Sequence, residues 1–323
     1  MYFRWVLIVF ILLCLIHTSL SDASHWDYGH VGPEVWEDSY PICQGKVQSP
    51  INILTACTVY NAFPAFQFSP ATNATQNFTI TNNGHTITAT QVDKNAFPLT
   101  LSGGGLNETY QFANFHLHWG ENYKSGSEHQ INGDNYAGEI HFVYSNSTTK
   151  RNAVLGIFIK SSKPNAHTRR KKRITREINS TDNSTVIAWE QYFSTADQLN
   201  STNDTNLISL QLSILMNTNL DKFYRYTGSL TTPPCDETVT WTVFQTPIEL
   251  SDDELELFRT YILSENSRSP QPLNGRIVYR SFQNDLPSTD TCCSPTVGKG
   301  SRGSRLMYHS YFFIFLFLFF FNS

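Results

Sequence analysis

The sequence predicts a mainly β (α+β) fold: a single domain with one large, twisted, mostly antiparallel sheet and a few short helices. The chain has 323 residues, and β-rich domains of roughly 200–250 residues commonly fold as one unit. Aromatic residues make up 14% of the chain, which suits a β-rich core. Several segments alternate between apolar and polar residues, whereas one segment alone carries clear helix-start residues.

The elements follow from local patterns. Two short strands within 77–89 turn at Asn82-Asn83-Gly84, where Asn and Gly accept a positive φ. Ser251 is the predicted N-cap of the clear helix, with Glu254 at its capping-box position. Segments 187–193 and 207–216 are compatible with either helix or extended structure. The further strands are predicted at 97–101, 110–119, 139–144, 153–160, 239–244 and 275–282.

Histidines two residues apart indicate a metal site on this sheet. His116 and His118 share a predicted strand, and residues at i and i+2 of a strand point to the same face, as Asn114 also does. A third histidine, His141, shares a face with Glu139 on the next strand. Three imidazoles from neighbouring strands can take three corners of a tetrahedral zinc site.

At these residues the chain resembles the α-class carbonic anhydrases. Any single motif is weakly specific, but five in the family's order are very specific, and they cover roughly residues 25–282. The resemblance implies reversible, zinc-dependent hydration of carbon dioxide to bicarbonate and a proton. The motifs are His116-Leu117-His118-Trp119-Gly120 with Glu139-Ile140-His141, Gln48-Ser49-Pro50-Ile51-Asn52-Ile53, Asn82-Asn83-Gly84-His85, Gly126-Ser127-Glu128-His129 and Gly228-Ser229-Leu230-Thr231-Thr232-Pro233-Pro234.

The resemblance makes His116, His118 and His141 the ligands of Zn²⁺, the implied cofactor. In carbonic anhydrase itself, the source of this number, zinc lowers the pKa of bound water to about 7. Glu139 and Asn114 would hold the second ring nitrogens of His141 and His116. The family more usually has Gln where this chain has Asn114, so a longer or water-mediated contact is expected there.

Further roles follow from the same resemblance. Thr231 corresponds to the residue that accepts the proton of the attacking oxygen and donates its own to a buried carboxylate, here Glu128. The backbone N–H of Thr231 would bind the substrate oxygen, and Thr232 would line the pocket. His85 stands at the proton-shuttle position, which suits an imidazole of pKa about 6.5–7. His129 is expected to be buried and hydrogen-bonded.

Carbon dioxide is apolar and needs an apolar wall. Val143, Val154, Leu230 and Trp241 match the family's pocket positions, and packing in the core is a compatible role for each. Tyr28 is expected either at the mouth of the site or packed beneath a loop.

The start of the chain resembles a secretory signal peptide, residues 1–23. Arg4 precedes an apolar run, and Ser21-Asp22-Ala23 resembles a cleavage site. A single-pass anchor is the alternative. The catalytic domain is then predicted at 24–283.

The end of the chain resembles a GPI-attachment signal. A stalk at 284–304 precedes a C-terminal segment, 305–323, whose apolar run is shorter than the about 20 residues that span a membrane. Ser301 and Gly298 are the candidate attachment sites, and a short tail anchor is the alternative. The predicted location is therefore secreted or at the cell surface.

Five cysteines follow the signal peptide, an odd number for an oxidising compartment. The resemblance implies that Cys43 pairs with Cys235, as in secreted members of the family. Cys57 can pair with Cys292 or with Cys293, which leaves one thiol over, and the sequence does not decide between the two.

The density of Asn-x-Ser/Thr sequons favours a glycosylated extracellular surface. A basic run at 169–173 indicates a solvated loop or, alternatively, a convertase cleavage site. The sequons are at Asn73, Asn77, Asn107, Asn146, Asn179, Asn183, Asn200 and Asn203.

The net charge of −4, with both signs spread along the chain, gives no basic face for nucleic acid. The predicted partners are carbon dioxide and bicarbonate, and a membrane through the anchor. A catalytically weak carbonic-anhydrase-related module that binds partners at the cell surface is the alternative. A mineral-matrix enzyme would carry acidic or Gly-Asn repeats, which this sequence lacks.

Overall fold

The computed structural model describes residues 25–161, 183–216, 218–250, 252–263 and 265–283. The predicted fold class is confirmed, because a 13-stranded, mostly antiparallel sheet dominates these residues and the helices are few and short. The helices are α2 (Trp36–Ser39), α3 (Asn183–Ala196), α4 (Leu212–Leu215) and α5 (Asp252–Tyr261), with 3₁₀ turns η1 (Pro41–Gln44), η2 (Thr55–Cys57) and η3 (Pro70–Asn73).

The strands alternate between buried and accessible residues over much of their length, as the sequence pattern requires. In chain order they are β1 (Asn52–Ile53), β2 (Val59–Tyr60), β3 (Phe66–Phe68), β4 (Gln76–Asn82), β5 (Ile87–Gln91), β6 (Thr100–Gly103), β7 (Tyr110–Trp119), β8 (Gln130–Ile131), β9 (Gly138–Asn146), β10 (Arg151–Lys160), β11 (Thr205–Leu210), β12 (Phe223–Gly228), β13 (Val239–Phe244), β14 (Ile248–Glu249) and β15 (Tyr279–Arg280).

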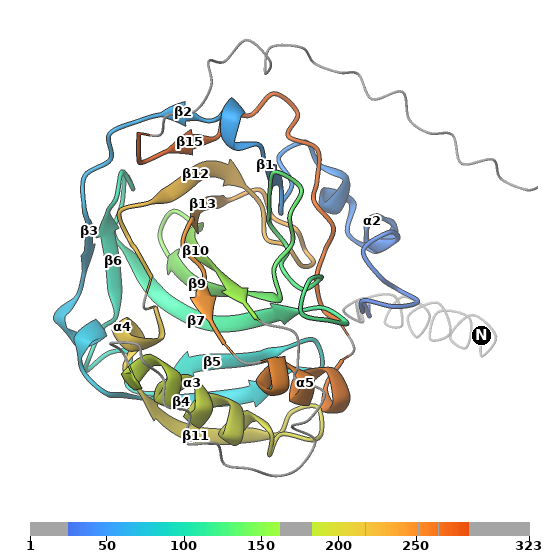
Figure 1. Cartoon of the computed structure of the whole chain (residues 1–323), viewed down its shortest axis with the longest axis vertical. Helices are drawn as coiled ribbons and strands as arrows, with labels where there is room; N and C mark the ends of the chain where they lie inside the picture. The colour runs from blue at the N-terminus through green and yellow to red at the C-terminus, as the bar shows by residue number, and fades with distance from the viewer. Residues whose placement is uncertain (1–24, 162–182, 217, 251, 264, 284–323) are drawn as a thin grey trace, which may run out of the picture. The chain divides into compact units, whose positions relative to one another are not determined.

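The large sheet runs in the order β11-β4-β5-β7-β9-β10-β13-β12-β15-β2, with β14, β3 and β6 paired off this path. Strands β7, β9 and β10 are its long central members and pair antiparallel. The pairs of β10 with β13, β10 with β14 and β15 with β2 are parallel. Figure 1 shows α3 and α5 beside β4, β5 and β11. β1 and β8 form a separate parallel pair.

One face of β7 packs into the core. Phe115, Leu117 and Trp119 are fully buried. The Phe115 ring contacts Trp189 and Tyr192 of α3, with ring centroids 6.2 and 5.4 Å away. Because side chains alternate along a strand, helix packing on this face leaves the histidines of β7 on the other.

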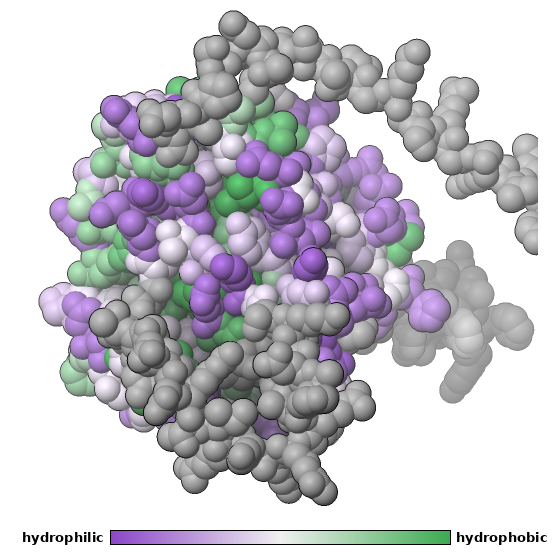
Figure 2. Space-filling view, viewed as in Figure 1, coloured by the Kyte–Doolittle hydropathy of each residue, from purple (hydrophilic) through white to green (hydrophobic). Residues whose placement is uncertain are grey.

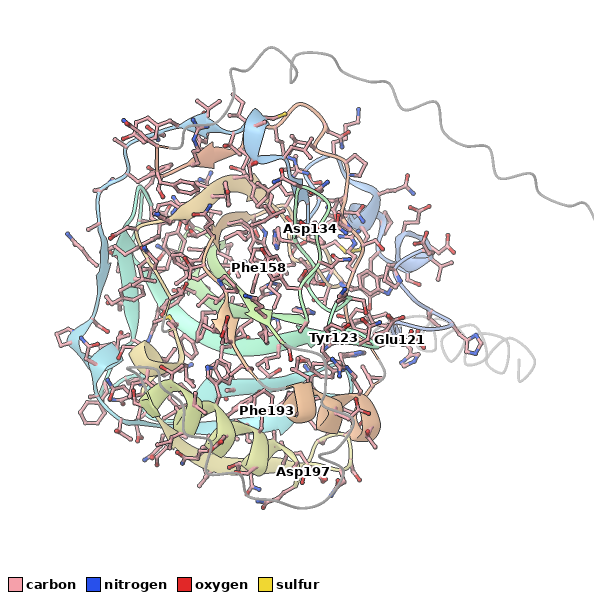
Figure 3. All side chains as sticks on the ribbon, viewed as in Figure 1. Glu121, Tyr123, Asp134, Phe158, Phe193 and Asp197 are labelled. Carbon is pink, nitrogen blue, oxygen red and sulfur yellow. A yellow bond between two sulfur atoms is a disulfide. The ribbon has the colours of Figure 1, made fainter. Side chains whose placement is uncertain are left out.

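Two apolar clusters, a larger and a smaller one, form most of the core, and a third, minor one contains Trp36, Cys43 and Cys235. The larger contains residues of the sheet and of α3, α4 and α5, among them Phe193. The smaller contains residues of β10, β12 and β13, among them Phe158. Figure 3 labels both side chains on their elements. The face of the described residues seen in Figure 2 is mostly hydrophilic, with smaller hydrophobic areas between.

Some predicted elements have other bounds. Segment 207–216 is divided between strand β11 and the short helix α4. Of the predicted strand 275–282 only β15 is paired, because Asn274 and Gly275 have positive φ values of 50° and 78° and turn the chain. The clear helix is α5, but its predicted N-cap, Ser251, lies outside the described residues. Among those residues no helix has both the length and the apolar character needed to cross a membrane.

Candidate metal centre

Two neighbouring strands bring the three predicted histidines together. The register of β7 and β9 places His116 opposite His141, with His118 two residues further along β7. One ring nitrogen of each histidine lies within 4.8 Å of the other two. His118 and His141 are buried, and His116 is half-buried. Strand alternation therefore gathers three imidazole nitrogens at one place on the sheet.

His116 is held by Asn114 on the same strand face. The Nδ1 atom of His116 lies 2.9 Å from Asn114 Oδ1. The expectation of a longer or water-mediated contact is therefore wrong. Side chains at i and i+2 of a strand lie side by side, and the pairing of β7 with β9 is irregular between Phe112 and Asn114. In this position the shorter Asn side chain reaches the ring directly.

His118 and His141 are held by two other acceptors. His118 Nδ1 lies 2.7 Å from the carbonyl oxygen of Asn266, and His141 Nε2 lies 2.9 Å from Glu139 Oε1. A neutral imidazole that donates through one nitrogen keeps a lone pair on the other. His118 Nε2 is buried and has no hydrogen-bond partner among the described residues. The nitrogens left for a ligand are Nε2 of His116 and His118 and Nδ1 of His141.

This donor set fits a zinc ion. Burial lowers the pKa of all three histidines, and that of His118 to about 3, so the rings are neutral at pH 7. Neutral imidazole is the form that ligates a metal, and three such nitrogens leave one position of a tetrahedral zinc open. The buried, unpaired Nε2 of His118 is costly alone, and a cation between the three rings would give it a partner.

Glu139 is the buried centre of a wider hydrogen-bond network. Its Oε1 lies 2.7 Å from His129 Nδ1, and its Oε2 accepts from the backbone N–H groups of Glu128 and His129 at 3.1 and 2.8 Å. Burial alone would raise the pKa of Glu139, but the charges of His129 and His141 and their hydrogen bonds hold it well below its usual value. The expectation that His129 is buried and hydrogen-bonded is confirmed, and its Nε2 lies 2.6 Å from the Tyr226 hydroxyl.

Glu128 and Thr231 meet beside the histidines, and both are buried. Glu128 Oε2 lies 3.4 Å from His118 Nε2 and 3.8 Å from His141 Nδ1. Burial raises the pKa of Glu128 well above its usual value. Hydrogen bonds from the backbone N–H of Arg268, 3.0 Å from Oε1, and from the Thr231 side chain act in the opposite direction.

Asn266 is a further residue of the centre, one that was not predicted from the sequence. Its carbonyl oxygen holds His118, and its Oδ1 accepts the backbone N–H of Trp119 at 2.7 Å. Its Nδ2 donates to the carbonyl oxygens of His85 and Leu117 at 3.0 and 3.1 Å. Asn266 lies after α5, outside any strand or helix. No spacing or periodicity marks it there, so only the folded contacts identify it.

Arg268 was also missed, and it ties the centre to a disulfide. Its guanidinium donates to Gln48 Oε1 at 2.9 Å and to the carbonyl oxygen of Cys43 at 2.8 Å. The predicted disulfide between Cys43 and Cys235 is confirmed. The backbone N–H of Cys235 donates to the Thr232 carbonyl oxygen at 2.9 Å. The disulfide therefore lies directly against the loop that carries Thr231 and Thr232.

Cys57 is also disulfide-bonded. Its predicted partners, Cys292 and Cys293, lie outside the described residues.

The four predicted wall residues come together. Val154 and Trp241 are buried in the smaller apolar cluster, and the partly buried Val143 and Leu230 pack against it. The Trp241 ring centroid lies 4.8 Å from that of His141. An apolar surface therefore borders the histidines on the β10–β13 side.

His85 follows the β4–β5 turn, as expected, and is half-buried. Its ring stacks on Trp26 with the ring centroids 3.7 Å apart. Burial lowers the pKa of His85, and the neighbouring charge of His25 adds to this effect. Tyr28 packs edge-on against Trp26 and Trp36, with ring centroids 5.7 and 5.6 Å away. Tyr28 is therefore packed against the aromatic residues of the N-terminal segment, which is one of its two expected roles.

Comparison with known proteins agrees with this geometry. Residues 31–282 match the family model of the eukaryotic-type carbonic anhydrases. Carbonic anhydrase 7 of Mus musculus is 32% identical over 283 residues, which cover 80% of this chain and 97% of the relative. Putative carbonic anhydrase 3 of Caenorhabditis elegans is 31% identical over 271 residues, covering 80% and 99%. Carbonic anhydrase 12 of Homo sapiens is 29% identical over 293 residues, covering 81% and 74%.

Proposed function

Because this chain belongs to the eukaryotic-type carbonic anhydrase family, we propose that it catalyses the zinc-dependent, reversible hydration of carbon dioxide to bicarbonate and a proton. One observation carries the proposal. Each of His116, His118 and His141 has one ring nitrogen bonded to a protein acceptor and the other turned toward its two partners. Inactive relatives of such enzymes would be expected to lose part of this set, and this chain keeps all of it.

His116, His118 and His141 would hold the zinc ion. When bound, zinc supplies a water of lowered pKa, about 7 in carbonic anhydrase itself, where the number was measured. Asn114 and Glu139 orient the rings of His116 and His141 so that their free nitrogens stay in place.

Thr231 and Glu128 would orient the attacking oxygen. The Thr231 hydroxyl donates a hydrogen bond to the Glu128 carboxylate. The Thr231 oxygen can then only accept a hydrogen bond from the attacking oxygen. The backbone N–H of Thr231 would receive an oxygen of carbon dioxide. Thr232 would line the pocket beside it.

The remaining roles concern the substrate and the proton. Val143, Val154, Leu230 and Trp241 would exclude water and receive the apolar substrate. His85 would carry the released proton to solvent, because its half-buried ring lies between the protein interior and bulk water.

We further propose that the enzyme acts outside the cell, with residues 1–23 as a signal peptide, 24–283 as the catalytic domain, 284–304 as a stalk and 305–323 as a GPI-type signal. The disulfide between Cys43 and Cys235 supports this location, because such bonds persist in oxidising compartments. The sequons support it as well.

The test is stopped-flow hydration of carbon dioxide by the purified fragment 24–290, with zinc counted per chain. We expect about one zinc per chain and hydration that a chelator abolishes. A folded fragment with one zinc and no hydration would favour the alternative, a binding module at the cell surface. A folded fragment that takes up no zinc would overturn the metal assignment.

A further inference from the structure

A shallow groove of about 450 Å³ lies on the surface away from the metal centre. It is lined by the connection from η3 into β4 and by the turn that follows β5. Figure 1 shows β4 and β5 side by side, with β11 along the other edge of β4. Most of its lining is apolar, but Asp93 and Thr75 also line it.

The large exposed hydrophobic residue of this groove is Phe97, which is 55% exposed. Its backbone is well anchored. The Phe97 N–H donates to the Asp93 carbonyl oxygen at 3.0 Å, and Gln91 Nε2 donates to the Phe97 carbonyl oxygen at 2.7 Å. An exposed aromatic ring on an anchored backbone, with polar groups beside it, is suited to a ligand with one apolar face and several hydroxyls.

Asn77 lines the same groove and begins the sequon Asn77-Phe78-Thr79. Phe78 points into the core and Asn77 is exposed, because they are neighbours on β4. The Asn77 Oδ1 atom accepts a hydrogen bond from the Ser209 hydroxyl at 2.8 Å. No described residue accepts a hydrogen bond from Asn77 Nδ2. This amide nitrogen is therefore available for a covalent bond.

The other described sequons differ from this one. Asn146 is half-buried and donates through Nδ2 to the Thr109 carbonyl oxygen at 3.2 Å. Its Oδ1 accepts from the backbone N–H groups of Thr148 and Thr149. Asn73, Asn107, Asn200 and Asn203 are exposed but do not themselves line the groove, although Ala74 and Thr75 of the Asn73 sequon do. Among the described sequons, only Asn77 combines a free amide nitrogen with this groove.

We propose that Asn77 carries an N-linked glycan whose first N-acetylglucosamine lies in the groove against the Phe97 ring. This rests on the proposed passage through the secretory pathway. There Asn77 Nδ2 loses a proton and bonds the anomeric carbon of the sugar. The bond from that carbon to the diphosphate of a lipid-linked oligosaccharide donor breaks, and the lipid diphosphate leaves. The sugar's C–H face covers Phe97, and its hydroxyls meet Asp93 and Thr75.

The first experiment locates the glycan. The full chain is expressed in eukaryotic cells, treated in ¹⁸O water with an amidase that releases N-linked glycans, and digested for mass spectrometry. We expect ¹⁸O-labelled aspartate at position 77. Label at any other sequon without label at 77 overturns this inference and leaves the secretory location standing. No label at any sequon overturns both.

The second experiment tests the groove through a double-variant cycle. Thr79→Ala removes the sequon while Asn77 and its Ser209 contact stay in place, and it is combined with Phe97→Ala. Losing the glycan should lower the Tm by about 2–4 °C when Phe97 is present. It should change the Tm little in the Phe97→Ala background.

Val92→Ala serves as the matched control for Phe97→Ala. Val92 is 46% exposed in the same turn but does not line the groove. In the Val92→Ala background, Thr79→Ala should therefore lower the Tm as it does in the wild type. An equal loss of Tm in all three backgrounds would show that the glycan does not contact Phe97, and the inference would be overturned.

Discussion

At the scale of single residues, the centre depends on which of two ring nitrogens each histidine presents. The three acceptors that settle this are chemically different: a side-chain amide from Asn114, a main-chain carbonyl from Asn266 and a carboxylate from Glu139. Each fixes one tautomer, and the carboxylate also makes its partner ring a stronger base. The rings are therefore set in place by the protein before any metal arrives.

His118→Ala tests the ligand assignment. It leaves two protein nitrogens at the centre, so we expect loss of stoichiometric zinc and of nearly all hydration activity. Zinc per chain after dialysis and stopped-flow hydration measure these losses. The control is His30→Ala, because His30 is exposed and lies outside the centre. The assignment fails if a folded His118→Ala protein keeps zinc and activity like the control.

His85→Ala tests the proton shuttle. Attack on carbon dioxide does not use this side chain, whereas release of the proton does. We expect kcat at low buffer to fall, by up to the ~10²–10⁴-fold typical of a general acid–base group, with kcat/KM almost unchanged. Imidazole buffer should restore much of kcat. A parallel fall of kcat/KM, or no rescue, would assign His85 a structural role in its turn.

Strand alternation made the local part of the centre predictable. Asn114, His116 and His118 follow from one i, i+2 pattern, and Glu139 and His141 from another. Asn266 could not be predicted in this way, because 148 residues separate it from His118 and it lies in a loop. Contacts of that kind are set by how the whole sheet closes, which no short window of sequence contains.

At the scale of elements, the central strands position the site and the loops complete it. β7 and β9 carry the histidines, and the loop after β12 carries Thr231. The strands were predicted well where burial alternates, as in β4 and β5. They were predicted less well near residue 275, because Asn274 and Gly275, which have positive φ values, turn the chain where a strand was predicted to begin.

The disulfide between Cys43 and Cys235 should stabilise both the fold and the Thr231 loop. It joins residues 192 apart in the sequence, and the chain-entropy model gives roughly 5 kcal/mol for a loop of this length, a model-dependent figure. We expect the Cys43→Ser, Cys235→Ser double variant to lose several kcal/mol in urea unfolding. Replacing both cysteines avoids a free thiol, and an unchanged urea midpoint would contradict the expectation.

At the scale of the whole molecule, the buried histidines couple stability to pH. Their pKa values are lowered in the folded protein, that of His118 to about 3. The unfolded chain, with histidine pKa values of about 6.5, therefore binds more protons than the folded one as the pH falls below that value. The stability that depends on neutral rings is complete above about pH 6.5 and is lost below it.

We expect the unfolding free energy of the metal-free protein to fall below pH 6.5, by up to about 1.4 kcal/mol per pH unit for each such histidine. Urea unfolding at several pH values between 7.5 and 5, with a chelator present, measures this slope. The metal-free His118→Ala variant is the control and should show a shallower slope. Equal slopes would mean that His118 is not kept neutral by burial.

The proposed anchor gives a further expectation for the whole chain. A GPI-linked enzyme has no spanning helix, so a phosphatidylinositol-specific phospholipase C should release active enzyme from intact cells. Retention after this treatment, with residues 305–323 still found by mass spectrometry, would favour a tail anchor. The control is a variant in which a known spanning helix replaces residues 305–323. The lipase should not release this variant from the cells.

The distant contacts of the centre also govern how the protein is made. The chain emerges from the ribosome N-terminus first. The three histidines of the centre have therefore left the ribosome before Asn266 and Arg268 have been synthesised. Until then the acceptor for His118 and the N–H donor to Glu128, 148 and 140 residues further on, do not exist. Pairings across such separations form slowly. A nascent chain therefore carries His118 without its acceptor, whereas Asn114 and Glu139, the acceptors for His116 and His141, are already present. Final assembly of the centre waits for nearly the last part of the domain.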